Sequence, residues 1–168
     1  MHVVTQNVDD LHERAGSEVL AHLHGSLFAF RCSACGTPCP EQLVAGLHLD
    51  RPVSLDDEPA PEPPPACPAC GGPVRPGVVR FGEELPAGAL DRAADAVAAA
   101  DLVLVVGTSG LVQPAASLPL LAAGRGVPVV EVNPEDTALT PHATWAVRAT
   151  SAQALPRIVP DGRGTPSR

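Results

Sequence analysis

The sequence contains two Cys-x-x-Cys pairs, Cys32 with Cys35 and Cys67 with Cys70. Two such pairs can surround one metal ion with four thiolates, which is the closed tetrahedral shell of a structural zinc site. Four unbound buried thiols are the plain alternative, but the paired spacing favours a metal. Cys39 lies outside both pairs, and we expect an unpaired, small buried residue there rather than a ligand. A thioredoxin-like redox role fits two pairs around one loop less well.

A second group of polar residues follows a short apolar stretch in HVVTQNVDD. Gln6, Asn7 and Asp9 come where a strand ends, and α/β sheets bind their ligands at the carboxyl ends of strands. The same residues have a simpler interpretation, in which Asp9 or Asp10 caps a helix by accepting hydrogen bonds from free backbone amides. Capping alone therefore explains part of the cluster.

His24, in HLHGS, is the candidate general base, because an imidazole titrates near neutral pH. The glycine that follows it permits another backbone segment to approach closely. His22 and His12 compete for the same role. A histidine near a turn is also commonly a hydrogen-bonded structural residue, and that alternative stands for each of the three.

Two later strand ends also carry polar residues. Gly107, Thr108 and Ser109 form a small-residue turn whose amides and hydroxyls suit a ribose or a phosphate. Glu131 and Asn133, in EVN, place an acid and an amide where they suit ribose hydroxyls. Ordinary turns explain both stretches equally well.

Alternating strands and helices must position these residues, and the pattern predicts a doubly wound α/β fold. Apolar runs rich in Val are typical of buried parallel strands. Ala-rich runs favour helices, and Pro119 should kink the helix that contains it or delay its start. The expected strands are 2–7, 77–83, 101–109, 127–133 and 144–149, and the expected helices are 17–25, 86–100, 114–126 and 151–159.

Composition narrows the class of protein. The 168 residues are 45% hydrophobic but only 2% aromatic, so Val, Leu and Ala must build the core. A formal net charge of −8 disfavours nucleic-acid binding, which needs clustered cations. No apolar run is long enough to span a membrane, and the N-terminus has no secretion-signal pattern. Paired cysteines fit a reducing compartment, so the sequence predicts a cytoplasmic protein.

The ordered motifs TQNVD, HLHGS, CxxC, CxxC, GVVRFGE, VVGTS and EVN resemble those of the sirtuins, the NAD-dependent protein-lysine deacylases. The resemblance covers the chain from Val4 to about Val159, and details such as HGSLF and VVRFGE look most like the class III, desuccinylase-like branch. It implies a Rossmann-type domain with a small zinc domain, and a cleft between them for NAD and an acyl-lysine peptide. The implied reaction transfers an acetyl group, or a succinyl or malonyl group, from lysine to ADP-ribose and releases nicotinamide.

The resemblance also implies a role for each matching residue. His24 matches the general base, and the zinc ion holds the small domain together without taking part in the chemistry. The VVRFGE segment matches the place where a substrate peptide adds as a strand. The implied cofactor-binding residues are Gln6, Asn7, Asp9, Gly107, Thr108, Ser109, Asn133, Ser151 and Ala152; the implied substrate-binding residues are Val79, Phe81, Gly82 and Glu83; the implied zinc ligands are Cys32, Cys35, Cys67 and Cys70.

The implied domains are an NAD-binding domain, 1–30 with 78–159, and a zinc module, 31–77, which contains an acidic Pro-rich loop, 50–66. Residues 160–168 are expected to be a disordered tail. The family's Gly-Ala-Gly phosphate loop, expected before TQN, has no match, so we expect a truncated record of a longer enzyme rather than a natural short form. The alternatives to a deacylase are a zinc-containing module that binds peptides and an ADP-ribosyl transferase that uses the same pocket.

Overall fold

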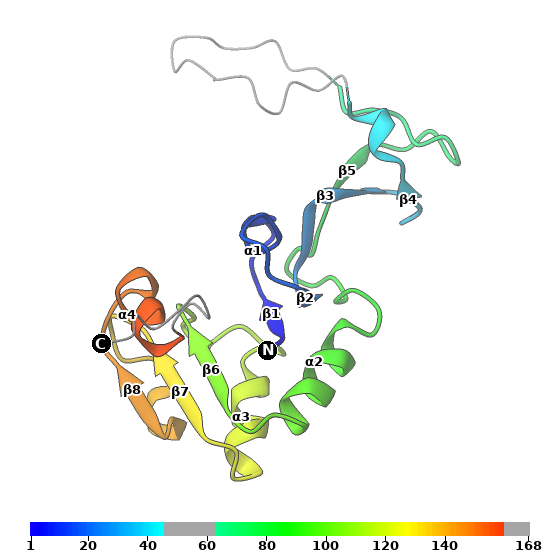
Figure 1. Cartoon of the computed structure of the whole chain (residues 1–168). Coiled ribbons are helices and arrows are strands. Elements are labelled where there is room, and N and C mark those ends of the chain that lie inside the picture. The colour runs from blue at the N-terminus through cyan, green and yellow to red at the C-terminus, as the bar shows by residue number, and fades with distance from the viewer. Residues whose placement is uncertain (46–62, 160–168) are drawn as a thin grey trace. The chain divides into compact units, whose positions relative to one another are not determined.

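The computed structural model describes residues 1–45 and 63–159, and the chain forms two compact units (Figure 1). Unit 1 is Met1–Ala87 and unit 2 is Gly88–Arg168. Most of the Pro-rich loop and the whole of the tail 160–168 lie outside the described residues. The domain boundaries expected from the sequence differ from this division into units, and they stay a prediction. Among the described residues, no helix is long and apolar enough to cross a membrane.

Unit 1 begins with a parallel pair of strands, β1 (Val3–Thr5) and β2 (Val19–His22), joined through the short helix α1 (Leu11–Arg14). The helix expected over 17–25 is therefore wrong. Glu, Leu and Ala favour helix in isolation, but here the backbone of this stretch pairs with β1, and tertiary pairing overrides local propensity.

The rest of unit 1 is an antiparallel ribbon that carries the cysteines. Figure 1 shows its long central strand, β3, between β4 and β5. The strand expected over 77–83 is only partly right, because β5 ends at Val78 and residues 80–83 form a turn. The elements are β3 (Gly25–Cys32), β4 (Pro38–Cys39), the 3₁₀ turn η1 (Glu41–Leu43) and β5 (Val74–Val78).

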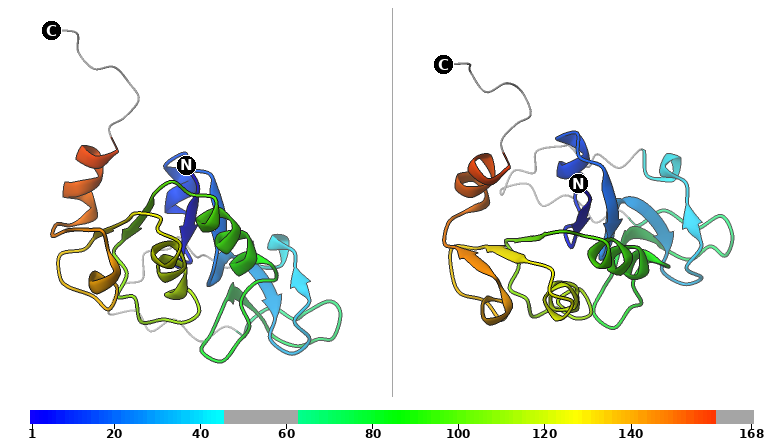
Figure 2. Two further views of the ribbon diagram at one scale, coloured as in Figure 1. Left: turned by 90° about the horizontal axis from the view of Figure 1, so that it is seen from below. Right: turned by 60° about the horizontal axis from the view of Figure 1, so that its bottom comes forward.

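Unit 2 is built on a three-stranded parallel sheet in the order β6-β7-β8. Helix α2 packs on α3, and α3 packs on β6 and β7 (Figure 2). The strands are β6 (Val103–Val106), β7 (Val129–Val132) and β8 (Trp145–Val147); the helices are α2 (Ala89–Ala98), α3 (Ser117–Gly124), the 3₁₀ turn η2 (Thr140–His142) and α4 (Ser151–Ile158).

The core of unit 2 is made of small and branched aliphatic side chains, as the low aromatic content predicts. Val105 from β6, Val129 from β7 and Ala122 from α3 pack together with Leu139, and Ala122 is fully buried. Pro119 lies in the first turn of α3, where a missing backbone N–H costs nothing, so the helix starts late, at Ser117. The α/β class with parallel strands is confirmed.

Candidate active site and metal centre

In unit 1, His24 lies two residues after the end of β2 and is half-buried, with its Nδ1 atom 3.1 Å from the carbonyl oxygen of Gln6. A carbonyl oxygen only accepts, so Nδ1 carries the proton in this contact. The neutral ring then has its lone pair on Nε2, which is the tautomer that a general base needs. The end of β1 thus orients the candidate base through main-chain atoms.

The competing histidine, His22, uses both ring nitrogens within unit 1. Its Nδ1 lies 3.2 Å from the carbonyl oxygen of Asn7, and its Nε2 lies 2.6 Å from Oε1 of Glu13. Partial burial lowers the pKa of His22, but the hydrogen bond and charge of Glu13 outweigh it and raise the pKa. The hydrogen bond with His22 in turn lowers the pKa of Glu13. These contacts make His22 a structural partner of Asn7 and α1.

The polar residues after β1 hold their own backbone in shape. The amide of Asn7 donates to Oγ1 of Thr5 at 3.0 Å, and the amide of Leu11 donates to Oδ1 of Asp9 at 3.1 Å. Asp9 therefore satisfies an amide at the start of α1, as the capping interpretation predicts. Asp10, at the N-cap position, makes no side-chain capping bond.

The segment 79–83 is joined to the candidate base through the backbone. The amide of Val79 donates to the carbonyl oxygen of His24 at 2.9 Å. Next to it, Gly25 pairs with Val78 at a φ of +76°, and a Cβ on Gly25 would come within 2.0 Å of the carbonyl oxygen of Gly77. The glycine of the HG pair thus permits this close approach, as predicted.

The carboxylate of Glu83 binds within unit 1. It lies 2.5 Å from Arg31 on β3 and 2.5 Å from Arg75 on β5, and it accepts the amide of Arg80 at 3.1 Å. Arg31 and Arg75 face each other across the two strands, where like charges repel, and Glu83 bridges them. Arg75, together with the Arg80 amide, lowers the pKa of Glu83 to about 2. Phe81, by contrast, is fully exposed.

The four paired cysteines converge on one point. Their sulfur atoms all lie within 4.8 Å of one another, with 3.5 Å between Cys32 and Cys70 and 3.9 Å between Cys35 and Cys67. A tetrahedral zinc ion with bonds of about 2.3 Å needs sulfur atoms about 3.8 Å apart, so the quartet fits that ion. Cys39 is buried beside the quartet but does not belong to it, as predicted.

The environment of these thiols also suits a cation. Hydrogen bonds with the side chain and backbone of Thr37 lower the pKa of Cys35 to about 6, which favours a thiolate. A hydrogen bond with the backbone of Gly72 lowers the pKa of Cys70, but Cys35 and Cys32 outweigh it and raise that pKa to about 12. Four crowded sulfurs therefore lose all their protons readily only when a metal ion balances the charge.

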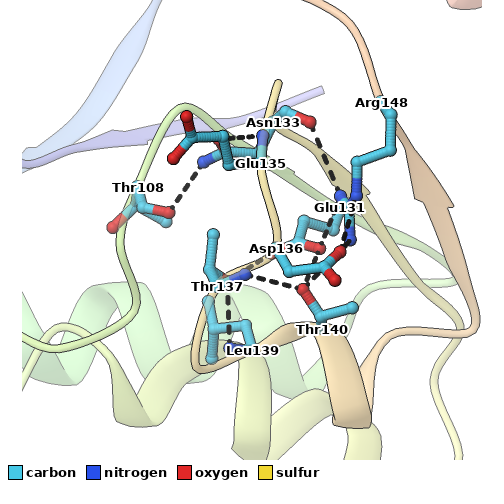
Figure 3. A network of polar contacts seen from close by, with 9 residues as sticks. All are labelled: Thr108, Glu131, Asn133, Glu135, Asp136, Thr137, Leu139, Thr140 and Arg148. Atoms are coloured by element: carbon cyan, nitrogen blue, oxygen red, sulfur yellow. Dashed lines mark hydrogen bonds and ion pairs between the residues drawn. The ribbon is translucent and has the colours of Figure 1, made fainter.

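Unit 2 contains a pocket of about 350 Å³, at the carboxyl ends of β6 and β7. Gly107, Thr108 and Ser109 line one side and Asn133 the other, so the structure brings these four predicted residues together. The side-chain amide of Asn133 donates to the carbonyl oxygen of Thr108 at 3.1 Å and thereby joins the two strand ends (Figure 3). The remaining lining residues are Leu111, Glu135, Asp136, Thr137 and Ala138.

Three other predicted residues of unit 2 are not brought into this pocket. Ser151 and Ala152 are exposed in the first turn of α4 and do not line it. Glu131, expected to face ribose hydroxyls, is only 1% exposed, and its carboxylate binds Thr137, Thr140 and Arg148 instead. That expectation is corrected, because the side chain turns into the unit rather than toward the pocket.

The burial of Glu131 could have been predicted from the residues around it. An acid inside an otherwise apolar strand is buried with it and therefore requires partners. The partners come from later in the chain: they are Thr137, Thr140 and Arg148, and sequence reasoning selected none of them.

Comparison with known proteins shows the family of the chain. The model of the Sir2 family matches residues 1–114. The chain belongs to the Sir2 family. This confirms the sirtuin resemblance. Among curated relatives of this Sir2-family chain, the NAD-dependent protein deacylase 2 of Corynebacterium efficiens is 52% identical over 95% of the chain. The NAD-dependent protein deacylase Sir2 of Mycolicibacterium smegmatis is 52% identical over 94% of it.

Solved structures give the same result. A Sir2 homologue in complex with NAD superimposes with a TM-score of 0.77 at 44% identity, and the match covers 94% of this chain and 56% of that one. A Sir2 complex with a p53 peptide and NAD⁺ gives a TM-score of 0.76 at 33% identity, over 94% of this chain and 61% of that one. The Sir2-family chain also spans 59% and 61% of the two curated relatives.

Proposed function

We propose that this chain carries out NAD-dependent removal of acyl groups from protein lysines, with nicotinamide and O-acyl-ADP-ribose as products. The proposal rests on the main-chain contacts that hold His24. Its Nδ1 atom contacts the carbonyl oxygen of Gln6, and its own carbonyl oxygen accepts a hydrogen bond from the amide of Val79. The names of the relatives, NAD-dependent protein deacylases, support the same activity. Acetyl-lysine is the proposed substrate group, with succinyl- and malonyl-lysine as further candidates.

In this mechanism, Nε2 of His24 takes a proton from a ribose hydroxyl, because Nδ1 is already a donor to Gln6. NAD, when bound, supplies the ribose that accepts the acyl group and the nicotinamide that leaves. Gln6, Asn7 and Asp9 are the proposed nicotinamide and ribose contacts in unit 1. Their backbone is held by Thr5, His22 and α1, so the polar groups are ordered before a ligand arrives.

The proposed adenosine site is the pocket of unit 2, with Gly107, Thr108, Ser109 and Asn133 as contacts. Ser151 and Ala152, which lie in the first turn of α4 and do not line the pocket, are proposed as further contacts of the adenine end. The pocket volume of about 350 Å³ is within the range of small-molecule sites. The proposed peptide contacts are Val79, Phe81, Gly82 and Glu83, through the main chain. Two arginines already bind the carboxylate of Glu83. We therefore expect the backbone of this segment, rather than the Glu83 side chain, to form hydrogen bonds with a peptide.

We further propose that the four paired cysteines hold one zinc ion that orders the ribbon of unit 1. The closed shell of four sulfurs leaves no position for a substrate, so the role of this ion is structural. The paired cysteines favour a reducing compartment, so the proposed place of action is the cytoplasm. Acylated proteins are the proposed partners there.

The test mixes the zinc-loaded chain with NAD and matched acetyl-lysine and succinyl-lysine peptides, and products are weighed by mass spectrometry. The expected result is O-acyl-ADP-ribose from the wild-type chain and none from His24→Ala, because the variant lacks the base. His12→Ala is the matched control and should keep the product. Peptide retention without any product would instead favour the zinc-containing peptide-binding module, and ADP-ribosylated peptide would favour the transferase.

A further inference from the structure

Glu131 is a buried acid at the centre of unit 2, on a strand whose other residues are all valine. Its carboxylate accepts hydrogen bonds from the hydroxyls of Thr137 and Thr140, the second at 2.8 Å, and from Arg148 at 3.0 Å (Figure 3). Burial raises the pKa of Glu131, but these donors outweigh it and leave the pKa lowered. The residue is therefore a carboxylate that unit 2 fully supplies with donors.

Arg148 joins this carboxylate to the loop that follows β7. Its guanidinium also binds Asp136, with Nε 2.8 Å from Oδ1, and donates to Oγ1 of Thr140 at 3.1 Å and to the carbonyl oxygen of Asn133 at 3.5 Å. Arginine can make these contacts together because its donors form a planar fork. Both ends of the loop 133–140 are thus fixed to one side chain.

The hydroxyls that bind Glu131 also bind the loop's backbone. Oγ1 of Thr140 accepts the amide of Thr137 at 2.8 Å, and Oγ1 of Thr137 accepts the amide of Leu139 at 3.0 Å. Leu139 is 2% exposed and packs so tightly on Gly110 that a Cβ there would lie 2.5 Å from its Cγ. The network therefore holds Leu139, and with it the loop, in contact with Gly110 in the Gly107–Gly110 turn.

These contacts end at the pocket. Asn133, Asp136 and Thr137 line it, and each is bonded to Arg148 or Glu131. We propose that Glu131 and Arg148 are positioning residues that hold the loop 133–140 in the shape that forms this pocket, and so set its affinity for the adenosine part of NAD. The identity of the ligand in this inference rests on the proposed function. The role of Glu131 and Arg148 in holding the loop rests only on the hydrogen-bond network.

The experiment measures two properties of each variant: amide hydrogen exchange and affinity for ADP-ribose by calorimetry. Arg148→Met and Glu131→Gln should speed exchange in 134–140 and leave α2 and β6 protected, because they remove the fork or the charge that holds the loop. ADP-ribose affinity should fall by about tenfold or more, since small misplacements of contact groups cost that much. Arg148→Lys should recover part of the affinity, because it keeps the charge but not the fork.

Arg125→Met is the control, since it removes an exposed arginine after α3 and should change neither property. Asp136→Asn is a milder variant that leaves the buried pair intact and should loosen the loop less. In a preparation that turns over, KM for NAD should rise in Arg148→Met while kcat stays within about twofold.

Unchanged exchange in 134–140 in both Arg148→Met and Glu131→Gln would overturn the inference, and so would faster exchange with unchanged ADP-ribose affinity. A wild-type chain that fails to bind ADP-ribose would instead contradict the proposed function of the pocket, and the exchange result would then decide the inference by itself.

Discussion

At the scale of single residues, the two histidines near the end of β2 differ in what their ring nitrogens contact. His22 has both nitrogens engaged, by Asn7 and Glu13, whereas the contact of His24 with Gln6 fixes only Nδ1 as a donor. The sequence HLHG places them two residues apart and gives no way to rank them. The ranking comes from partners elsewhere in the chain, which only the fold brings near.

The His22–Glu13 pair predicts a pH window for stability. The raised pKa of His22 means that its contribution is present below the ordinary histidine pKa and lost as the pH rises through the raised value. The lowered pKa of Glu13 means that its contribution is present above the ordinary glutamate pKa and lost as the pH falls through the lowered value. Glu13→Gln should therefore shift the NMR titration midpoint of His22 downward.

Glu18→Gln is the matched control for this titration, because Glu18 is an exposed acid that makes no described contact with His22. An identical His22 midpoint in the wild type and Glu13→Gln would contradict the assigned pair.

Residue spacing was enough to predict the four cysteine ligands, because chelating pairs are local and each pair fixes its own geometry. It was not enough for Glu131, whose donor Arg148 lies 17 residues further along the chain. A buried acid beside an amide looks the same in sequence whether it faces a ligand or its own unit. The sign that favours the second case is the strand itself, since every neighbour of Glu131 within β7 is apolar.

At the scale of secondary-structure elements, the antiparallel pairing of β3 with β5 depends on Gly25. Gly25→Ala should cost at least about 2 kcal/mol of unfolding free energy, because it adds a positive-φ penalty to a clash with the Gly77 carbonyl oxygen. Gly36→Ala separates the two effects. Gly36 has a φ of +72° but nothing within 4 Å of a Cβ, so its cost should be about 1 kcal/mol.

Denaturant titration of both variants checks this expectation. Equal losses for Gly25→Ala and Gly36→Ala would mean that the close approach of the two strands contributes nothing beyond the backbone angle.

Glu83 links a turn to a ribbon, and its removal should loosen the turn. Glu83→Gln leaves Arg31 and Arg75 facing each other without a counter-charge, so amide exchange in 79–82 should rise and affinity for an acyl-lysine peptide should fall. Because the pKa of Glu83 is lowered to about 2, the wild-type bridge is present at neutral pH and lost only as the pH falls toward that value.

The neighbouring acid provides the control for the turn. Glu84→Gln removes an exposed charge and should leave exchange in 79–82 as in the wild type. If both variants behave alike, the effect of Glu83 is one of net charge and not of the two-arginine bridge.

The elements themselves were predictable where local signals agreed with the fold. The Ala-rich run of α2 and the valine runs of β6 and β7 formed as expected. The stretch 17–25 did not, because its helix-favouring residues pair with β1 as a strand. The strand expected over 77–83 ended early because Glu83 bends the chain back onto Arg31 and Arg75. In both cases the deciding partner is distant in sequence.

At the scale of the whole molecule, the two compact units should respond differently to metal removal. The core of the ribbon contains Cys32 and Cys67 themselves, packed with Val44 and Val74. Removing zinc with a chelator, or with Cys67→Ala, should therefore raise amide exchange in β3 and β5, while β6 and β7 stay protected.

Cys39→Ala is the control, because that buried residue is outside the quartet, and the variant should still bind one zinc ion per chain. Zinc loss in Cys39→Ala, or exchange that rises equally in both units, would contradict the assignment of the ligands or the independence of the units.

The single tryptophan, Trp145, begins β8, and the sequence has no tyrosine. All three phenylalanines, Phe28, Phe30 and Phe81, lie in unit 1. Intrinsic tryptophan emission therefore comes from unit 2 alone, on the strand that leads to Arg148, with no other indole to average over. Tryptophan fluorescence therefore reports on unit 2 without an added label and does not report on unit 1.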